Sequence, residues 1–171
     1  MVGFISASED QVNSLIREQL SFALRELGLS LGSNVMVHSS LSSMGHLDGG
    51  ADTAVESLLD VIGPSGTLVV PTFTPCHFPD KEVNPVFDPL KDHSQMGQIT
   101  EAVRKWPGAK RSRHLLHSLA AIGPLARDIT DVHGPSAWAC DGPFWKLYEL
   151  DAYILLLGVP YLRCTYFHVV E

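Results

Sequence analysis

The segment His168-Val169-Val170-Glu171 places an imidazole and a carboxylate three residues apart. If this segment is helical, the two side chains share a face and can form a hydrogen bond. A carboxylate beside an imidazole fixes its tautomer and stabilises the imidazolium. The spacing therefore indicates His168 as a general base that removes a proton from an attacking group, with Glu171 as the residue that orients it.

Further reactive side chains gather beside four apolar segments that we expect to be strands. Three groups follow such a segment and one group precedes it: His38-Ser39-Ser40, then Thr72, then Cys164-Thr165 with His168, and last Ser112, His114, His117 and Ser118, which come before residues 119–122. Open α/β sheets bind ligands beyond the carboxyl ends of their strands. A binding site at that edge is therefore predicted, although serine and threonine also serve there to satisfy loop backbone groups.

Other chemistries have weaker support. His114 and His117 are spaced like metal ligands, and together with His38 they leave a metal-dependent hydrolase open as an alternative. No His-Glu-x-x-His motif accompanies them, and we predict no metal. The nucleophile elbow Gly-x-Ser-x-Gly and both glycine-rich nucleotide motifs are absent. The run from Arg25 to Ser30 has only a superficial likeness to the pyrophosphate loop of GNAT acetyltransferases, because it ends an amphipathic helix.

The elements that must position these residues follow from hydrophobic periodicity and from capping and turn residues. A capping box at Ser8-x-x-Gln11 precedes a helix whose apolar face includes Leu15 and Ile16 and which ends at Gly28. The remaining expected elements are helices over 51–62, 96–106 with Ser94 as cap, 124–130 and 144–150, and strands over 34–38, 67–71, 119–122 and 152–157. Long loops span 72–92 and 134–142.

This alternation predicts an α/β fold with a three-layer-like arrangement, in which a central, mostly buried sheet is flanked by helices. No internal repeat or linker divides the chain, so we expect residues 1–171 to form a single domain.

The composition of the chain indicates which classes of binding partner are expected. The chain has 171 residues, 45% of them hydrophobic and 18% charged, with a formal net charge of −7. No broad basic face is available for nucleic acid, whereas an acidic surface attracts a cationic small molecule. Three cysteines without a Cys-x-x-Cys pair favour reduced thiols in the cytoplasm. No apolar run is long enough to cross a membrane, and no oligomeric state is predicted.

The ordered set of segments resembles the aminoglycoside 3-N-acetyltransferase family, also called antibiotic N-acetyltransferases. The matching runs are Val37 to Leu41, Gly45 to Ala51, Leu58 to Thr72, Phe87 to Pro89, Met96-Gly97, Arg111 to His114, His117 to Ala121, Leu147 to Asp151, Leu155 to Val159, Cys164-Thr165 and His168 to Glu171. No single run is decisive, but their order and spacing match over about residues 10 to 171.

The resemblance implies an α/β fold distinct from GNAT and acetyl transfer from acetyl-CoA to a primary amine of an aminoglycoside or a related amino sugar. It implies a catalytic pair, His168 and Glu171. The implied coenzyme A contacts are His38, Ser39, Ser40, Leu41, Thr72, Ser112, His114, His117 and Ser118. The chain departs from many antibiotic-modifying members at Leu115-Leu116 and at Leu162, which bears on the acceptor. Because members of the family extend beyond the His-x-x-Glu segment, the chain corresponds to the N-terminal part of their fold, and a coenzyme A-binding homologue without activity is the alternative.

Overall fold

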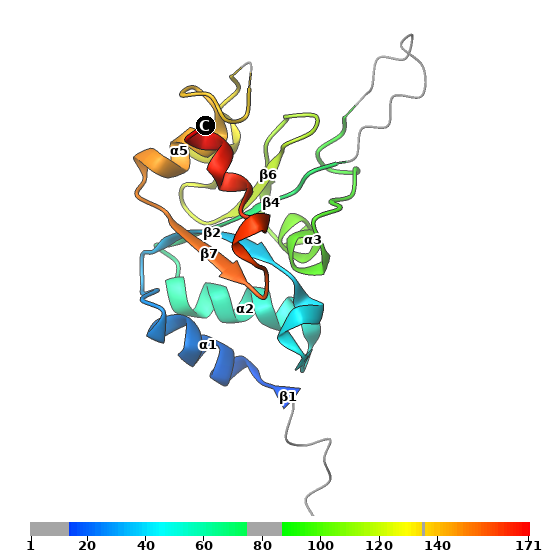
Figure 1. Cartoon of the computed structure of the whole chain (residues 1–171), viewed down its shortest axis with the longest axis vertical. Coiled ribbons are helices and arrows are strands. Elements are labelled where there is room, and N and C mark those ends of the chain that lie inside the picture. Colours follow the sequence, from blue (N-terminus) through cyan, green and yellow to red (C-terminus); the bar gives the residue numbers. More distant parts are fainter. Residues whose placement is uncertain (1–13, 75–86, 135) are drawn as a thin grey trace, which may run out of the picture.

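The computed structural model describes residues 14–74, 87–134 and 136–171. Its helices and strands follow one another as shown in Figure 1. Their bounds are β1 Ser14–Leu15, α1 Arg17–Glu26, β2 Asn34–Ser39, η2 Leu41–Met44, β3 His46–Leu47, α2 Gly50–Ile62, β4 Thr67–Pro71, α3 Gln98–Lys105, β5 Lys110–Arg111, β6 Leu119–Ile122, α4 Ala126–Thr130, α5 Pro143–Glu149, β7 Tyr153–Leu157, η3 Tyr161–Arg163 and η4 Thr165–Val169. The η elements are 3-10 helices.

A five-stranded sheet with the order β5-β6-β4-β2-β7 forms the middle of the molecule. β2 lies parallel to β4 on one side and to β7 on the other, so that Val35 is opposite both Leu68 and Tyr153. β6 runs antiparallel to β4 and to β5. All five residues of β4 are buried, as expected for a strand covered on both faces. The predicted α/β class with a central, mostly buried sheet is therefore confirmed.

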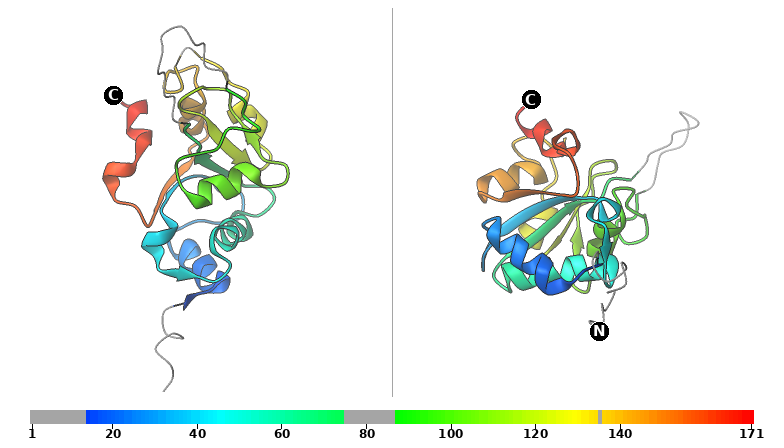
Figure 2. Two further views of the ribbon diagram at one scale, coloured as in Figure 1. Left: turned by 90° about the vertical axis from the view of Figure 1, so that its right-hand side faces the viewer. Right: turned by 60° about the horizontal axis from the view of Figure 1, so that its bottom comes forward.

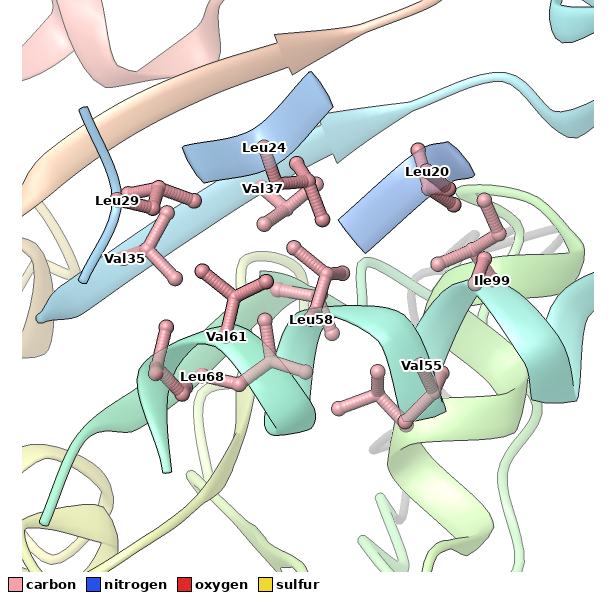
Figure 3. Packing of buried hydrophobic residues seen from close by; sticks show 14 of the residues in the cluster. Leu20, Leu24, Leu29, Val35, Val37, Val55, Leu58, Val61, Leu68 and Ile99 are labelled. Atoms are coloured by element: carbon pink, nitrogen blue, oxygen red, sulfur yellow. The ribbon is translucent and has the colours of Figure 1, made fainter. Parts of the chain in front are cut away.

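One face of the sheet packs against α1, α2 and α3. Alternate strand residues such as Val35 and Val37 of β2 point to this face, where they meet Leu24 of α1 and Leu58 of α2. Figure 3 shows these side chains interlocking in a layer between β2 and α2. Val35, Met36 and Val37 of β2 are all fully buried, although successive side chains point to opposite faces of the sheet. This explains why the sequence of the strand is a continuous apolar run.

The opposite face holds a second cluster, which is formed with α4, α5 and the η4 segment. Met36, the residue between Val35 and Val37, points to this side and packs in a cluster that includes Phe144 and Leu147 of α5. In Figure 2 the segment after β7 stands on the side of the sheet away from α1 and α2. The three layers are therefore helices, sheet and helices, as the sequence predicts.

The N-terminal helix begins later than predicted. Leu15 was expected on a helical face, but Ser14–Leu15 is extended and pairs in parallel with His46–Leu47 of β3. Ile16 is also extended, and its amide N–H donates to the side chain of Gln19, so α1 starts at Arg17. Pairing with β3 therefore outweighs the helical periodicity here. The predicted capping box at Ser8-x-x-Gln11 lies outside the described residues.

Helix α3 also begins at a different residue from the one expected. Ser94 was predicted as its cap, but the N-cap position is Gly97, with φ of +115°. The Ser94 hydroxyl instead accepts a hydrogen bond from the amide of Met96 at 3.2 Å and lies 3.2 Å from the hydroxyl of Thr100. Within the described residues, no helix is long and apolar enough to cross a membrane.

Candidate active site

The ends of four strands meet at one edge of the sheet. β2 ends at Ser39, β4 at Pro71 and β7 at Leu157, and these three strands run parallel. β6 runs in the opposite direction, so Leu119 at its start lies opposite Pro71. The segment that precedes β6 therefore reaches the same edge as the carboxyl ends of the other strands. The direction of β6 explains how all four predicted groups of reactive residues come to one edge.

Thr72 and Ser118 form a buried pair at this edge. The amide of Thr72 donates to the carbonyl oxygen of Ser118, and the Ser118 hydroxyl donates to the carbonyl oxygen of Thr72, each over 2.8 Å. Their two hydroxyl oxygens are 3.0 Å apart, and both residues are fully buried. Ser112 is also buried, and its hydroxyl accepts from the amide of Leu119 at 2.9 Å. These groups are engaged inside the protein, and their predicted contact with coenzyme A stays a prediction.

Arg111 of β5 joins this pair to the segment that leads into α3. Its Nε donates to the hydroxyls of Thr72 and Ser118 over 3.1 Å each, and Nη2 donates to the carbonyl of Thr72 over 2.6 Å. Its Nη1 donates to the carbonyls of Pro89 and Asp92. Burial lowers the pKa of Arg111 to about 10, so the guanidinium stays charged at neutral pH. One side chain thus anchors the segment before α3 to the end of β4.

His38 is a buried histidine with an unsatisfied nitrogen. It lies in β2 and is 3% exposed, and its Nε2 has no hydrogen-bond partner among the residues that the structure describes. Burial lowers the pKa of His38 to about 4, so its imidazole is neutral at physiological pH. Buried polar atoms without partners are uncommon and costly. Because His38 lines a pocket at the sheet edge, a polar group of a ligand bound there would supply the missing hydrogen bond.

Two neighbouring pockets lie along this edge. The first has a volume of about 640 Å³, and the second has a volume of about 490 Å³. They share the lining residues Ser39, Ser40, Gln95 and Met96. Leu41 lines the first pocket, whereas His38, Arg163 and Thr165 line the second. The hydroxyl oxygen of Thr165 is also buried and has no partner within the described part of the chain, so two such polar groups belong to the second pocket.

Two helices begin at the first pocket. Gly49 and Gly50 at the start of α2 line it, as do Gly97 and Gln98 at the start of α3. Across residues 14–74, 87–134 and 136–171, neither helix has a side-chain hydrogen bond that caps its N-terminus. The N–H groups of an uncapped first turn attract anionic groups, because they have no acceptor within the helix. The first pocket is therefore suited to a phosphate-bearing ligand.

The predicted pair is formed by His168, which lies on the 3-10 helix η4, and Glu171, which lies two residues beyond the end of that helix. Nδ1 of His168 lies 2.8 Å from a carboxylate oxygen of Glu171. When Nδ1–H donates to this carboxylate, Nε2 of the neutral ring carries the lone pair and can accept a proton. The pairing that the spacing indicated is thus present in the structure.

The remaining histidines of the predicted site lie in one ring cluster with His168. The Trp138 ring centroid is 5.1 Å from that of His168 and 5.3 Å from that of His117. His114 stacks on His117 at 5.4 Å. Burial lowers the pKa of His114, and burial, then His114 and His168, lower the pKa of His117. Two neutral imidazoles therefore lie beside the candidate base near pH 7.

The metal-hydrolase alternative has no matching geometry. Across residues 14–74, 87–134 and 136–171, no three His, Cys, Asp or Glu side chains come together as a group that could hold a metal ion. His38, His114 and His117, the three ligands of that hypothesis, form no such group among these residues.

Comparison with known proteins decides the family. The family model for aminoglycoside 3-N-acetyltransferases matches residues 36–171, which span most of β2 and everything that follows it. The chain belongs to this family. The resemblance inferred from the ordered motifs is thereby confirmed.

Individual members of the aminoglycoside 3-N-acetyltransferase family support the assignment. Aminoglycoside N(3)-acetyltransferase VII of Streptomyces paromomycinus is 35% identical over 91% of this chain and 59% of its own length. The structure of AAC-IIIb in a binary complex with CoASH has a TM-score of 0.84 at 30% identity, covering 91% of this chain and 63% of that one. The structure of AAC-VIa bound to sisomicin has a TM-score of 0.81 at 29% identity, covering 91% and 63%. The chain spans less than two thirds of the length of these relatives.

Three features of the candidate site were not predicted from the sequence. They are Trp138, Arg111 as an anchor, and the turn at Gln95-Met96-Gly97. Trp138 is a large aromatic residue within a loop of small and polar residues, and that contrast is the one signal that could have indicated it. The other two depend on long-range contacts, which no local pattern reveals.

Proposed function

We propose that this protein transfers the acetyl group of acetyl-CoA to a primary amine of an aminoglycoside or a related amino sugar. The observation that carries the proposal is the hydrogen-bonded pair of Glu171 and His168, because His168 lies on η4, the same short helix whose Thr165 lines the second pocket at the sheet edge. Family membership supports it, as do a relative solved with CoASH and another solved with sisomicin.

The pockets fit the parts of coenzyme A. The uncapped starts of α2 and α3 offer N–H donors to the phosphates in the first pocket. The pantetheine arm carries two amides, and the unsatisfied groups of His38 and Thr165 in the second pocket would bind such polar groups. With the arm in this direction, the thioester approaches η4, which carries His168.

The proton and electron transfers follow from this placement. Nε2 of His168 takes a proton from the attacking nitrogen while the new N–C bond forms at the thioester carbon. The C–S bond then breaks, and the imidazolium returns the proton to the sulfur, which gives an amide and CoASH. The carbonyl oxygen needs donors during attack. The amides of Ser40 and Thr72 already donate to Leu157 and Ser118, so a hydroxyl such as that of Ser39 is the better candidate.

Charge and the residues that line the second pocket indicate the kind of amine that acts as acceptor. A net charge of −7 attracts a polycationic amino sugar over long range. Leu162, where the sequence departs from many family members, lines the second pocket and is 94% exposed. An apolar side chain at this place favours an acceptor that presents an apolar ring face beside its amine.

The alternative is a protein that binds coenzyme A without turning it over. The observation that favours it is that neither His168 nor Glu171 is among the lining residues of the two pockets that would bind coenzyme A. We also propose that residues 1–171 form a single domain that corresponds to the N-terminal part of the family's fold.

The deciding experiment measures binding and turnover on the same variants. We expect His168→Ala to lower thiol release from acetyl-CoA, with amino sugars as acceptors, by about 100-fold or more. Calorimetry should give the same acetyl-CoA affinity as in the unchanged protein. His133→Ala, at an exposed loop histidine, is the matched control.

Unchanged turnover in His168→Ala would overturn the role of the base. Acetyl-CoA binding with no thiol release across a panel of amines, already in the unchanged protein, would favour the alternative.

A further inference from the structure

The hydrogen bond to Glu171 is not enough by itself to hold the side chain of the candidate base, His168, in one position. His168 lies on a five-residue 3-10 helix, and its side chain is 53% exposed. The Glu171 side chain is 70% exposed. Water competes for a hydrogen bond between two groups this exposed, and such pairs contribute little to fixing a side chain. Another contact must hold the imidazole in one rotamer if it is to act as a base.

Trp138 supplies that contact. Its ring and that of His168 meet at a centroid distance of 5.1 Å and an interplanar angle of 61°, close to an edge-to-face arrangement. Aromatic pairs favour this geometry over a face-to-face stack. The indole therefore restricts the movement of the imidazole through a ring contact. This contact leaves Nδ1 of His168 to its hydrogen bond with Glu171.

Trp138 is itself firmly positioned. Its ring packs against the fully buried Phe144, with centroids 3.9 Å apart, and against Phe73 at 6.2 Å. The preceding residue Ala137 is 1% exposed, and its carbonyl accepts from the amide of Phe144 over 3.2 Å. The start of α5 thus fixes the loop that carries the indole.

The loop that carries Trp138 leaves no room for a side chain at Gly142. A Cβ atom at Gly142 would lie 2.4 Å from the carbonyl oxygen of Ala137 and 2.6 Å from that of Ser136. The amide of Gly142 donates to the carbonyl of Ala139 over 2.7 Å. The loop folds back tightly on itself, so it can transmit the rigidity of α5 to the indole.

We propose that Trp138 is a positioning residue, which holds the imidazole of His168 with Nδ1 on Glu171 and Nε2 free. The ring of His117 also contacts Trp138, at a centroid distance of 5.3 Å, so the indole touches both imidazoles. The consequence for turnover rests on the proposed function, whereas the ring contact itself does not.

The first test measures the contact without activity. In NMR spectra, the carbon-bound ring protons of His168 should show a ring-current displacement from Trp138. We expect Trp138→Leu to abolish this displacement and Trp138→Phe to keep part of it. His168→Ala assigns the signals. Signals of His168 that stay unchanged in Trp138→Leu, with an unaltered circular dichroism spectrum, would overturn the proposal.

The second test separates positioning from folding and from binding. Trp138→Leu should lower kcat by about 10-fold to 100-fold, because small displacements of a catalytic group are costly. The KM for acetyl-CoA should stay within about 2-fold, and Trp138→Phe should restore most of kcat. Trp145→Leu is the matched control, since Trp145 packs on Tyr148 of the same helix.

The outcomes are distinguishable. An unchanged kcat in Trp138→Leu, or an equal loss in Trp145→Leu, would overturn the positioning role. If the unchanged protein releases no thiol, the proposed function fails, and the NMR measurement still decides whether Trp138 fixes His168.

Discussion

His38 couples the stability of the fold to pH. Its pKa is lowered to about 4 in the folded chain by burial, whereas an exposed histidine has a pKa near 6.5. Between these values the unfolded chain binds a proton that the folded chain does not, so stability is fully present above about pH 6.5 and is lost as pH falls toward 4. His114 and His117, whose pKa values are also lowered, act in the same direction.

We expect the free energy of unfolding to fall by about 2 to 3 kcal/mol from His38 alone between neutral pH and about pH 4.5. Urea unfolding at a series of pH values measures this. His38→Asn should flatten the dependence, and His133→Asn should not. An equally steep dependence in His38→Asn would show that the imidazole is not the group responsible.

Residue pairs close in sequence were predictable, and pairs made by the tertiary fold were not. The His168–Glu171 hydrogen bond follows from their spacing, because a single turn of helix brings the third residue onto the same face. The contact of Trp138 with His168 joins the loop before α5 to η4, and these two segments precede and follow β7 in the sequence. The predicted coenzyme A contacts of His38 to Leu41 have pockets beside them, but no ligand contact tests them.

At the scale of elements, the turn after β7 depends on one glycine. Gly158 has φ of +71°, and a Cβ atom there would lie 2.8 Å from the carbonyl oxygen of Ser40. The amide of Ser40 in turn donates to Leu157 over 2.9 Å, so the ends of β2 and β7 are held close together. Any side chain at this position must push Ser40 away from β7.

We expect Gly158→Ala to lower the free energy of unfolding by about 1 to 3 kcal/mol and to weaken acetyl-CoA binding, because Ser40 lines both pockets. Gly108→Ala is the matched control. Its φ is +83°, and a Cβ atom there would meet nothing within 4 Å in the described part of the chain, so it introduces strain without a clash. Denaturant titration and calorimetry compare the two, and equal losses would exclude the clash.

Elements with strong periodicity and clear stops were predicted well. α2 spans Gly50–Ile62, between Gly49 and Gly63, which agrees within one residue with the predicted helix over 51–62. The two-residue strands β1, β3 and β5 carry no periodic signal, since a partner strand alone defines them. The antiparallel direction of β6 was also not predictable, because a buried strand has the same apolar sequence in either direction.

At the scale of the whole molecule, the two hydrophobic clusters should unfold together. The strands β2, β4, β6 and β7 each send alternate side chains into both clusters, as Met36 and Val37 of β2 do, so neither cluster can lose these strands without the other. Trp106 packs against the cluster on the α1–α2 side, and Trp138 packs against the opposite one. The chain therefore carries a fluorescent probe on each face of the sheet.

We expect Leu58→Ala to lower the free energy of unfolding by about 3 kcal/mol, since the side chain is fully buried. The signals of Trp106 and Trp138 should still change in one coincident transition with urea, each followed in a background in which the other tryptophan and Trp145 are replaced by phenylalanine. Leu59→Ala, at a partly buried neighbour, is the control with a smaller loss. Separate transitions for the two probes would contradict the coupling of the clusters.

The pairing of β2 with β7 also determines when the site can assemble. Val35 lies beside Tyr153, although most of the chain separates them in sequence. Contacts this distant form slowly, because a long loop must close before any hydrogen bond compensates for the lost entropy. A growing chain on the ribosome carries β2 long before β7 exists, with one edge open to wrong partners. His38 and Ser39 gain their neighbours Leu156 and Leu157 only with β7, so the candidate site at this end of the sheet matures late during synthesis.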